Sequence, residues 1–168
     1  AVDRSAKRLV RMRENLERLG LDMDIQCQDA LTLQLAEKAD VVLLDAPCTA
    51  TGTIRRHPDV QHLKSDKDMG RMAGLQERLL DHAALHLVKK GGELIYAVCS
   101  LQAEEAEHQI ERFLARTKDF KRKAIGAEEV GGVAEIINEN GDIRCLPCHL
   151  KEKGGLDGFF VARLVNEG

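Results

Sequence analysis

The sequence predicts an α/β fold in which a parallel sheet carries helices on both faces. Short aliphatic runs alternate with longer segments whose apolar residues recur at helical spacing, which is typical of strand–helix–strand units. Aromatic residues make up 3% of the 168 residues, and Trp is absent. The core must therefore be aliphatic, as it is in parallel sheets that are buried on both faces. The length predicts a single domain over residues 1–168.

The first part of the chain predicts a strand end, a helix and a short strand. Residues 1–3 have the character of the last residues of a strand. Residues 5–19 are predicted to form a helix that Gly20 ends, because apolar residues recur in it at helical spacing: Leu9, Met12, Leu16 and Leu19. Residues 23–27 are predicted to form a short strand that leads to Asp29.

The rest of the chain continues the alternation. We expect, in order, a strand over 41–44, a polar loop over 61–70, a helix over 72–88, a strand over 94–98, a helix over 104–116, and strands over 143–146 and 159–164. The last two strands follow each other without a helix between them.

Charge and cysteine content limit the classes of function. The chain has 25 basic and 28 acidic residues and a net charge of −3, so it exerts no general attraction on nucleic acid. Any RNA contact must use a local basic patch or a basic region outside this sequence. No apolar run is long enough to span a membrane, and no signal peptide is apparent. Five Cys, an odd number, indicate reduced thiols in the cytoplasm.

Two stretches place a thiol after a buried strand. The first, VVLLDAPCTATGTIRRHPDV over residues 41–60, turns polar at Asp45 and carries Cys48. The second, GGELIYAVCS over residues 91–100, runs through an aliphatic strand to Cys99. If the two strands are neighbours in one parallel sheet, their carboxyl ends share an edge and both thiols open into the same crevice. Two thiols and an acid at one edge are suited to nucleophilic chemistry.

The two stretches together resemble a known family of enzymes. The Asp-Ala-Pro-Cys motif with Arg-Arg-His-Pro-Asp after it, followed by the Gly-Gly-x-Leu-x-Tyr-x-x-Cys-Ser strand, is similar to the RNA cytosine-5 methyltransferases of the Sun/Nol/Nop family. Within that family the bacterial enzymes for 16S ribosomal RNA are the nearest match. The resemblance covers nearly the whole chain. It implies a Rossmann-like class I methyltransferase sheet that the last two strands close as an antiparallel hairpin.

The resemblance also implies a reaction. A thiolate that adds to carbon 6 of cytosine makes carbon 5 able to take a methyl group from S-adenosylmethionine. By resemblance Cys99 is this nucleophile, Cys48 assists release of the product, and Asp45 contacts the base and the cofactor. The bland alternative is that both Cys are small buried hydrophobic residues. For one Cys that alternative is the better one, whereas two at matching strand ends in long matching motifs favour chemistry.

Two early acids are candidates for binding the cofactor. By resemblance Asp3 binds the ribose and Asp29 binds the adenine amino group. A helix cap or a turn explains each of them equally well, and the two explanations are compatible.

The start of the chain lacks one expected feature. A cofactor fold of this kind begins with a strand and a glycine-rich turn, but the first glycine here is Gly20. The resemblance places a Pro-Gly-Gly-Lys-Thr-like loop just before Val2. We therefore expect the C-terminal part of a catalytic domain, with the first strand of the sheet missing and no activity on its own. We expect residues 1–27 to be poorly anchored, displaced or paired with another molecule.

A basic cluster follows the first thiol. Arg55, Arg56 and His57 are candidates for binding RNA phosphates or for ordering the loop over the target base. A charge cluster is more often a solvated surface. Its position beside Cys48, with Pro58-Asp59 after it, favours the functional interpretation. The target cytosine must be single-stranded or flipped out of its stack before a thiol reaches it.

Residues 145–149 read Cys-Leu-Pro-Cys-His, which is the attachment pattern of c-type haem or half of a zinc site. Without an export signal or a second Cys-x-x-Cys, we interpret the pattern as coincidental and expect no metal.

The sequence thus favours an S-adenosylmethionine-dependent enzyme that methylates RNA, with ribosomal RNA ahead of transfer RNA as the substrate. A second hypothesis is a non-catalytic RNA-binding or assembly factor derived from a methyltransferase, for which the missing glycine loop argues. A third is the small haem or metal protein. The oligomeric state is not predicted.

Overall fold

The computed structural model describes the backbone of residues 1–168 and every side chain except that of Asp66. The chain divides into two compact units, Ala1–Ala36 and Glu37–Gly168, and each is described by itself. The predicted α/β class is confirmed. The assignment of residues 1–168 to one domain stays a prediction.

The first unit contains the helix that the sequence predicts. Helix α1 (Ala6–Leu19) begins after Ser5, whose side chain accepts a hydrogen bond from the backbone of Arg8. It ends at Gly20, which adopts a left-handed conformation with φ of 65°. Glycine pays no Cβ penalty there, which explains why the helix stops at this residue.

The strand predicted over 23–27 is wrong. Val2 and Gln26 form only an isolated parallel bridge. Leu21 and Met23, which flank this segment, are exposed. Two short segments that pair without a covered apolar face are marginal, so the pairing does not extend into a ladder.

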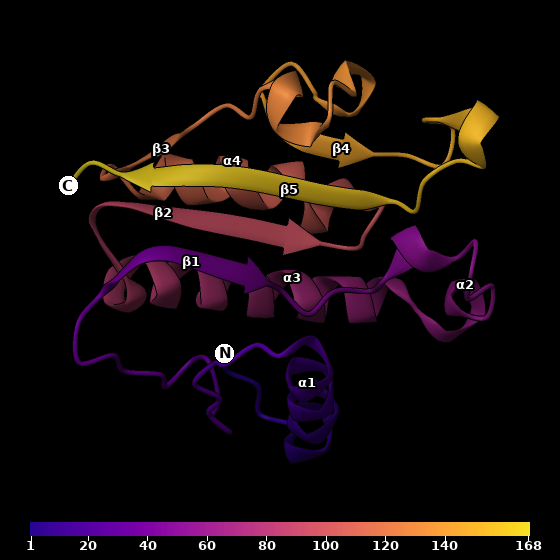
Figure 1. Cartoon of the computed structure of the whole chain (residues 1–168). Helices are drawn as coiled ribbons and strands as arrows, with labels where there is room; N and C mark the ends of the chain where they lie inside the picture. The colour runs from indigo at the N-terminus through magenta and orange to yellow at the C-terminus, as the bar shows by residue number, and fades with distance from the viewer. The chain divides into compact units, whose positions relative to one another are not determined.

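The second unit is built on a five-stranded sheet (Figure 1). Its strands are β1 (Ala39–Asp45), β2 (Val88–Val98), β3 (Phe120–Arg122), β4 (Ile143–Cys145) and β5 (Phe159–Asn166). They lie in the order β1-β2-β5-β3, and β4 also pairs with β5. The predicted pairing of the last two strands, β4 and β5, is confirmed as antiparallel.

The sheet of this unit is mixed, and the predicted parallel pairing holds for only one pair of its strands. Among the strands that the structure describes, β1 and β2 are parallel, whereas β5 runs antiparallel to β2, β3 and β4. Strand β3 was not predicted, because its three residues are too few to show a period. Strand β1 lies at one end of the strand order, and Leu43 on it is 66% exposed.

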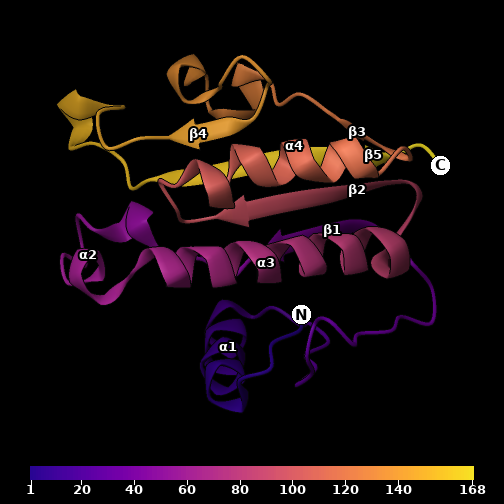
Figure 2. The ribbon, with the colours of Figure 1, turned by 180° about the vertical axis from the view of Figure 1, so that it is seen from behind.

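Two long helices pack on one face of this sheet, as views from the two sides show (Figures 1 and 2). They are α3 (Asp66–His82), which continues as a π-turn over Ala83–Leu87, and α4 (Glu107–Arg116). The core between helices and sheet includes several residues with an exposed fraction of 0%: Leu80, Ile110, Phe113, Leu94, Tyr96, Phe160 and Leu164. Helices on both faces of the sheet stay a prediction.

The predicted loop over 61–70 is wrong. A short helix, α2 (Val60–Leu63), is followed by Ser65, which caps α3. The Ser65 side chain accepts a hydrogen bond from the backbone of Asp68, and the Asp68 carboxylate accepts one from the backbone of Ser65. This capping box is visible in the sequence and starts a helix despite the polar composition.

No helix in the described part of the chain combines the length and the apolar character that a membrane crossing needs.

Candidate active site

The parallel pair β1 and β2 brings the two thiol-bearing loops to one edge of the sheet. Asp45, the last residue of β1, stands opposite Ala97 of β2, and Cys99 follows two residues later. The chain after β1 then returns toward β2, so that Cys48 Sγ lies 3.5 Å from Cys99 Sγ. The two thiols therefore lie together at the shared edge of two parallel strands, as the sequence predicts. The Asp45 side chain is exposed at the same edge.

The two thiols differ in their acidity. The pKa of Cys99 is lowered to about 7, chiefly because Cys48 donates a hydrogen bond to its sulfur, although burial and the charge of Asp45 act in the opposite direction. The pKa of Cys48 is raised, because the same hydrogen bond holds its proton and burial adds to the effect. Cys99 is therefore the thiol of the pair that loses its proton first.

A close crossing of backbones fixes the loop that carries Cys48. The Gly52 N–H donates to the Cys99 carbonyl over 3.0 Å, and the Gly158 N–H donates to the Gly52 carbonyl over 2.8 Å. A Cβ on Gly52 would overlap the backbone carbonyl of Gly158. Glycine is therefore required at the point where the loop passes between the ends of β2 and β5.

The loop after Cys99 is held by a residue to which the sequence analysis gave no role. Arg144 on β4 donates to the carbonyls of Ser100 and Leu101 over 2.9 and 2.8 Å. The same guanidinium forms an ion pair with Glu107 at 3.2 Å. No local sequence pattern predicts these contacts, because Arg144 lies more than forty positions away from the carbonyls that it binds.

The two arginines of the basic cluster, Arg55 and Arg56, already have partners within the chain. Arg55 and Arg56 both form ion pairs with Asp157, at 3.4 and 2.5 Å. Arg55 also donates to the Gly154 carbonyl over 2.6 Å. The Arg55 and Arg56 side chains are 50% and 59% exposed, and His57 is exposed as well. The ion pairs connect the loop after Cys48 to the segment that precedes β5.

The two early acids, Asp3 and Asp29, lie in the first unit. Asp3 Oδ1 accepts hydrogen bonds from the Ser5 backbone over 2.7 Å and from the Arg8 side chain over 2.9 Å. Asp29 Oδ1 accepts one from the Leu31 backbone over 2.9 Å. Both residues therefore have the local turn role that the sequence allowed. Their role toward a cofactor stays a prediction.

The Cys-x-x-Cys-His segment has other contacts. His149 Nδ1 accepts a hydrogen bond from the Leu146 backbone, and burial raises the pKa of Cys145. Cys148 is exposed. The residues that the structure describes include no group of three His, Cys, Asp or Glu placed to hold a metal ion.

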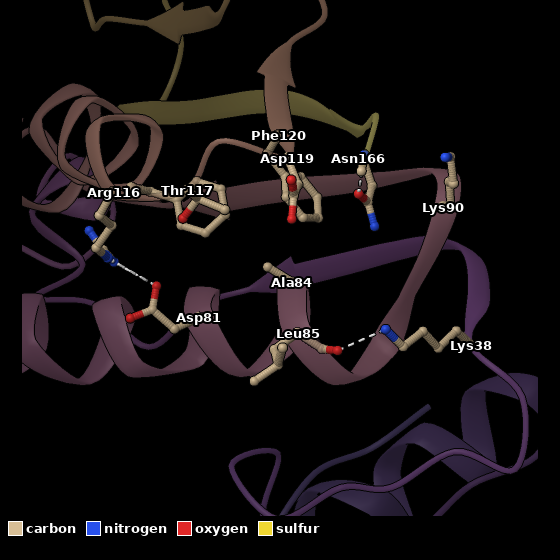
Figure 3. Close-up of a pocket in the computed structure, with 12 residues that line it drawn as sticks. Lys38, Asp81, Ala84, Leu85, Lys90, Arg116, Thr117, Asp119, Phe120 and Asn166 are labelled. Atoms are coloured by element: carbon tan, nitrogen blue, oxygen red, sulfur yellow. Dashed lines mark hydrogen bonds and ion pairs between the residues drawn. The ribbon is translucent and has the colours of Figure 1, made fainter.

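A pocket of about 470 Å³ lies at the opposite edge of the sheet (Figure 3). It is lined by Lys38 before β1, Lys90 near the start of β2 and Asn166 at the end of β5. It also contains the ion pair between Arg116 and Asp81. The amino-terminal ends of β1 and β2 border it, so it is separate from the thiol pair at their carboxyl ends.

Known structures identify the class of the fold. The chain resembles the N-methyltransferase NodS from Bradyrhizobium japonicum WM9 with a TM-score of 0.54 and 15% identity. At this identity the likeness shows only that the two proteins share the Rossmann-like methyltransferase fold.

The model of the family described as 16S rRNA methyltransferase RsmB/F matches residues 1–165, and this chain belongs to that family. The ribosomal RNA small subunit methyltransferase B of Pseudomonas syringae pv. tomato is 45% identical over 98% of the chain and 36% of the relative. The chain thus spans about a third of the length of the curated relatives that it matches. NSun6 from Pyrococcus horikoshii is 31% identical with a TM-score of 0.80, over 100% of this chain and 41% of that one.

Proposed function

We propose that this chain forms part of an enzyme that methylates carbon 5 of cytosine in 16S ribosomal RNA, with S-adenosylmethionine as the methyl donor. The observation that carries the proposal is the pair of thiols 3.5 Å apart, of which Cys99 has a pKa lowered to about 7. Relatives named as ribosomal RNA methyltransferases support the substrate class. A ribosomal RNA substrate places the reaction in the cytoplasm.

Cys99 acts as the nucleophile. Its thiolate bonds to carbon 6 of the cytosine, and the electron pair of the double bond between carbons 5 and 6 becomes available at carbon 5. S-adenosylmethionine, when bound, supplies an electrophilic methyl group to that carbon. A base then removes the carbon 5 proton, the double bond forms again and the Cys99 thiolate leaves. Asp45, at the same edge, shares a proton with ring nitrogen 3, and that proton neutralises the negative charge that the thiolate brings to the ring.

Cys48 changes its acidity during this cycle. Before the attack, the hydrogen bond to Cys99 is the main cause of the raised pKa of Cys48. Once the sulfur of Cys99 is bonded to carbon 6, it is no longer an anionic acceptor, so this cause disappears. Cys48 can then lose its proton to solvent, and as a thiolate it accepts the carbon 5 proton, which is the step that releases the product.

The first unit offers hydrogen-bond acceptors that fit part of the cofactor. Asp3 and Asp29 follow Val2 and Gln26, the two residues of the parallel bridge, so both carboxylates stand after the carboxyl ends of paired segments. Carboxylates in that position are suited to accept hydrogen bonds from ribose hydroxyls and from the adenine amino group. We assign the ribose to Asp3 and the amino group to Asp29.

Arg55, Arg56 and His57 bind the RNA backbone next to the target base. Asp157 forms ion pairs with both arginines on the loop that also carries Cys48, and their side chains stay 50% and 59% exposed. A net charge of −3 makes such a local contact necessary. The target cytosine leaves its stack before Cys99 reaches it.

The test is a chimera in which this chain replaces the matching third of the Pseudomonas syringae relative. Methyl transfer from labelled S-adenosylmethionine is measured on 16S ribosomal RNA and on transfer RNA, and modified nucleosides are identified by mass spectrometry. The proposal requires 5-methylcytosine in ribosomal RNA, lost in Cys99→Ala and kept in the control Cys145→Ala. Transfer to transfer RNA alone would reject the substrate, and no transfer by a folded chimera that binds the cofactor would reject the reaction.

A further inference from the structure

A buried carboxylate lies behind the thiol pair. Glu105 ends the short 3₁₀ turn Ala103–Glu105, six positions after Cys99, and its exposed fraction is 0%. Among the side chains that the structure describes, no Lys or Arg forms an ion pair with it. A carboxylate without a cationic partner is costly to bury unless neutral donors surround it.

The donors to Glu105 come from the two loops that carry the thiols. The Thr49 backbone N–H lies 2.9 Å from one carboxylate oxygen, and the Thr49 hydroxyl lies 2.5 Å from the other. The Ser100 hydroxyl donates to that second oxygen over 2.6 Å. Thr49 directly follows Cys48, and Ser100 directly follows Cys99. One carboxylate therefore binds the neighbour of each thiol.

Helix α3 holds the same group from the other side. The Gln76 side chain donates to Glu105 over 3.2 Å and to the carbonyl of Pro47, which precedes Cys48, over 2.9 Å. Gln76 is itself completely buried. The amide thus connects the carboxylate with the loop on the amino-terminal side of Cys48.

The backbone of Glu105 is fixed as well. The Tyr96 side chain on β2 is completely buried, and its hydroxyl donates to the Glu105 carbonyl over 2.6 Å. Glu105 is therefore held at both ends: Tyr96 of β2 binds its backbone carbonyl, and Gln76 of α3 binds its carboxylate.

We propose that Glu105 is a positioning residue for the thiol pair: it fixes the Cys48 and Cys99 loops so that the two sulfurs stay in hydrogen-bond contact. The proposal rests on the proposed function, because the contact matters to the reaction only if Cys99 is the nucleophile. Glu105 does not contact the substrate, because its side chain is completely buried and binds the residues next to the two cysteines.

If Glu105 acts through its position, Glu105→Gln should raise the pKa of Cys99, whereas if it acts only through its charge, the substitution should lower that pKa. The negative charge of Glu105 is among the smaller causes that raise the pKa of Cys99, so loss of charge alone would make this thiol more acidic. Loss of the clamp instead separates the sulfurs and removes the hydrogen bond that lowers the pKa. Positioning therefore predicts that the fraction of Cys99 present as thiolate at pH 7 falls on the order of tenfold in Glu105→Gln.

The experiment measures alkylation of Cys99 by iodoacetamide across pH in this chain, with the modified peptide quantified by mass spectrometry. Glu104→Gln is the matched control, because Glu104 is the adjacent glutamate and is exposed. We expect the midpoint to rise in Glu105→Gln and to stay near 7 in Glu104→Gln. An unchanged or lowered midpoint in a Glu105→Gln chain with native circular dichroism overturns the proposal.

A second variant keeps the test decisive if Glu105→Gln does not fold. Thr49→Val preserves the shape of the side chain and removes one hydroxyl donor to Glu105. A smaller rise of the same midpoint supports the clamp, and no rise overturns it.

The chimera separates this inference from the proposed function. If the unchanged chimera is folded and binds the cofactor but fails to methylate RNA, the proposed function fails, whatever the alkylation shows. If it methylates RNA and Glu105→Gln lowers kcat without changing the KM for S-adenosylmethionine, the positioning role stands. Equal kcat in Glu105→Gln and Glu104→Gln rejects it.

Discussion

The chain contains two pairs of cysteines, and they differ in almost every physical respect. Cys48 and Cys99 are 51 positions apart in sequence, yet their sulfurs lie 3.5 Å apart and their pKa values move in opposite directions. Cys145 and Cys148 are three positions apart, but one is half-buried with a raised pKa and the other is exposed. Spacing along the chain is therefore a poor guide to paired thiols, whereas the shared edge of two parallel strands is a good one.

Removal of each nucleophile candidate is the strongest way to break this comparison. In the chimera, Cys99→Ala should lower methyl transfer on the order of a thousandfold or more, because no other group supplies the attacking electron pair. Cys145→Ala should leave the rate within about twofold. The rates are measured on 16S ribosomal RNA with labelled cofactor. Equal losses in the two variants would contradict the distinction between the pairs.

Loss of the hydrogen-bond donor should have the next largest effect. Cys48→Ala removes the thiol that stabilises the Cys99 thiolate, so the pKa of Cys99 should rise from about 7 toward the ordinary range of Cys. It also removes the proposed proton acceptor, so a covalent RNA adduct should persist. Gel electrophoresis under denaturing conditions detects the adduct. Rapid turnover by this variant would show that another group releases the product.

The pH dependence of labelling should separate the pairs without any mutation. Thiolates react and thiols do not, so Cys99, with its pKa lowered to about 7, should be alkylated readily at pH 7.5. Cys145, with its pKa raised by burial, should react only at a clearly higher pH. Peptide mass spectrometry after brief exposure to iodoacetamide measures both. Coincident pH profiles for the two residues would remove the electrostatic part of the account.

Metal addition and removal should have the smallest effect. The described residues hold no cluster of three metal ligands, and the His149 ring nitrogen Nδ1 already accepts a backbone hydrogen bond. A chelator or added zinc should therefore leave the Tm of the chain unchanged, as Cys148→Ser should too. A rise of several degrees with zinc, lost in Cys148→Ser, would restore the metal interpretation of residues 145–149.

The sequence predicted the parts of the molecule that local patterns encode. Gly20 ends α1 as expected, and the aliphatic runs before Asp45 and Cys99 form the strands that meet at one edge. The capping box at Ser65 carries a local signal that the polar composition of its neighbours obscured.

The remaining parts of the site depend on contacts between distant residues. Glu105 binds Thr49 across 56 positions, and Arg56 binds Asp157 across 101. No periodicity or motif connects such residues, because only the tertiary fold brings them together. The three-residue strand β3 was missed for the related reason that its stability comes from pairing with β5 and not from its own composition.

The most direct test of the central claim is to trap the nucleophile. The chimera is mixed with S-adenosylmethionine and 16S ribosomal RNA that contains 5-fluorocytosine, whose carbon 5 carries no removable proton. The account predicts a stable covalent adduct, and mass spectrometry of the digested complex should place the modified nucleotide on Cys99. An adduct on Cys48, or methyl transfer to normal RNA without any trapped adduct on its fluorinated counterpart, would contradict it.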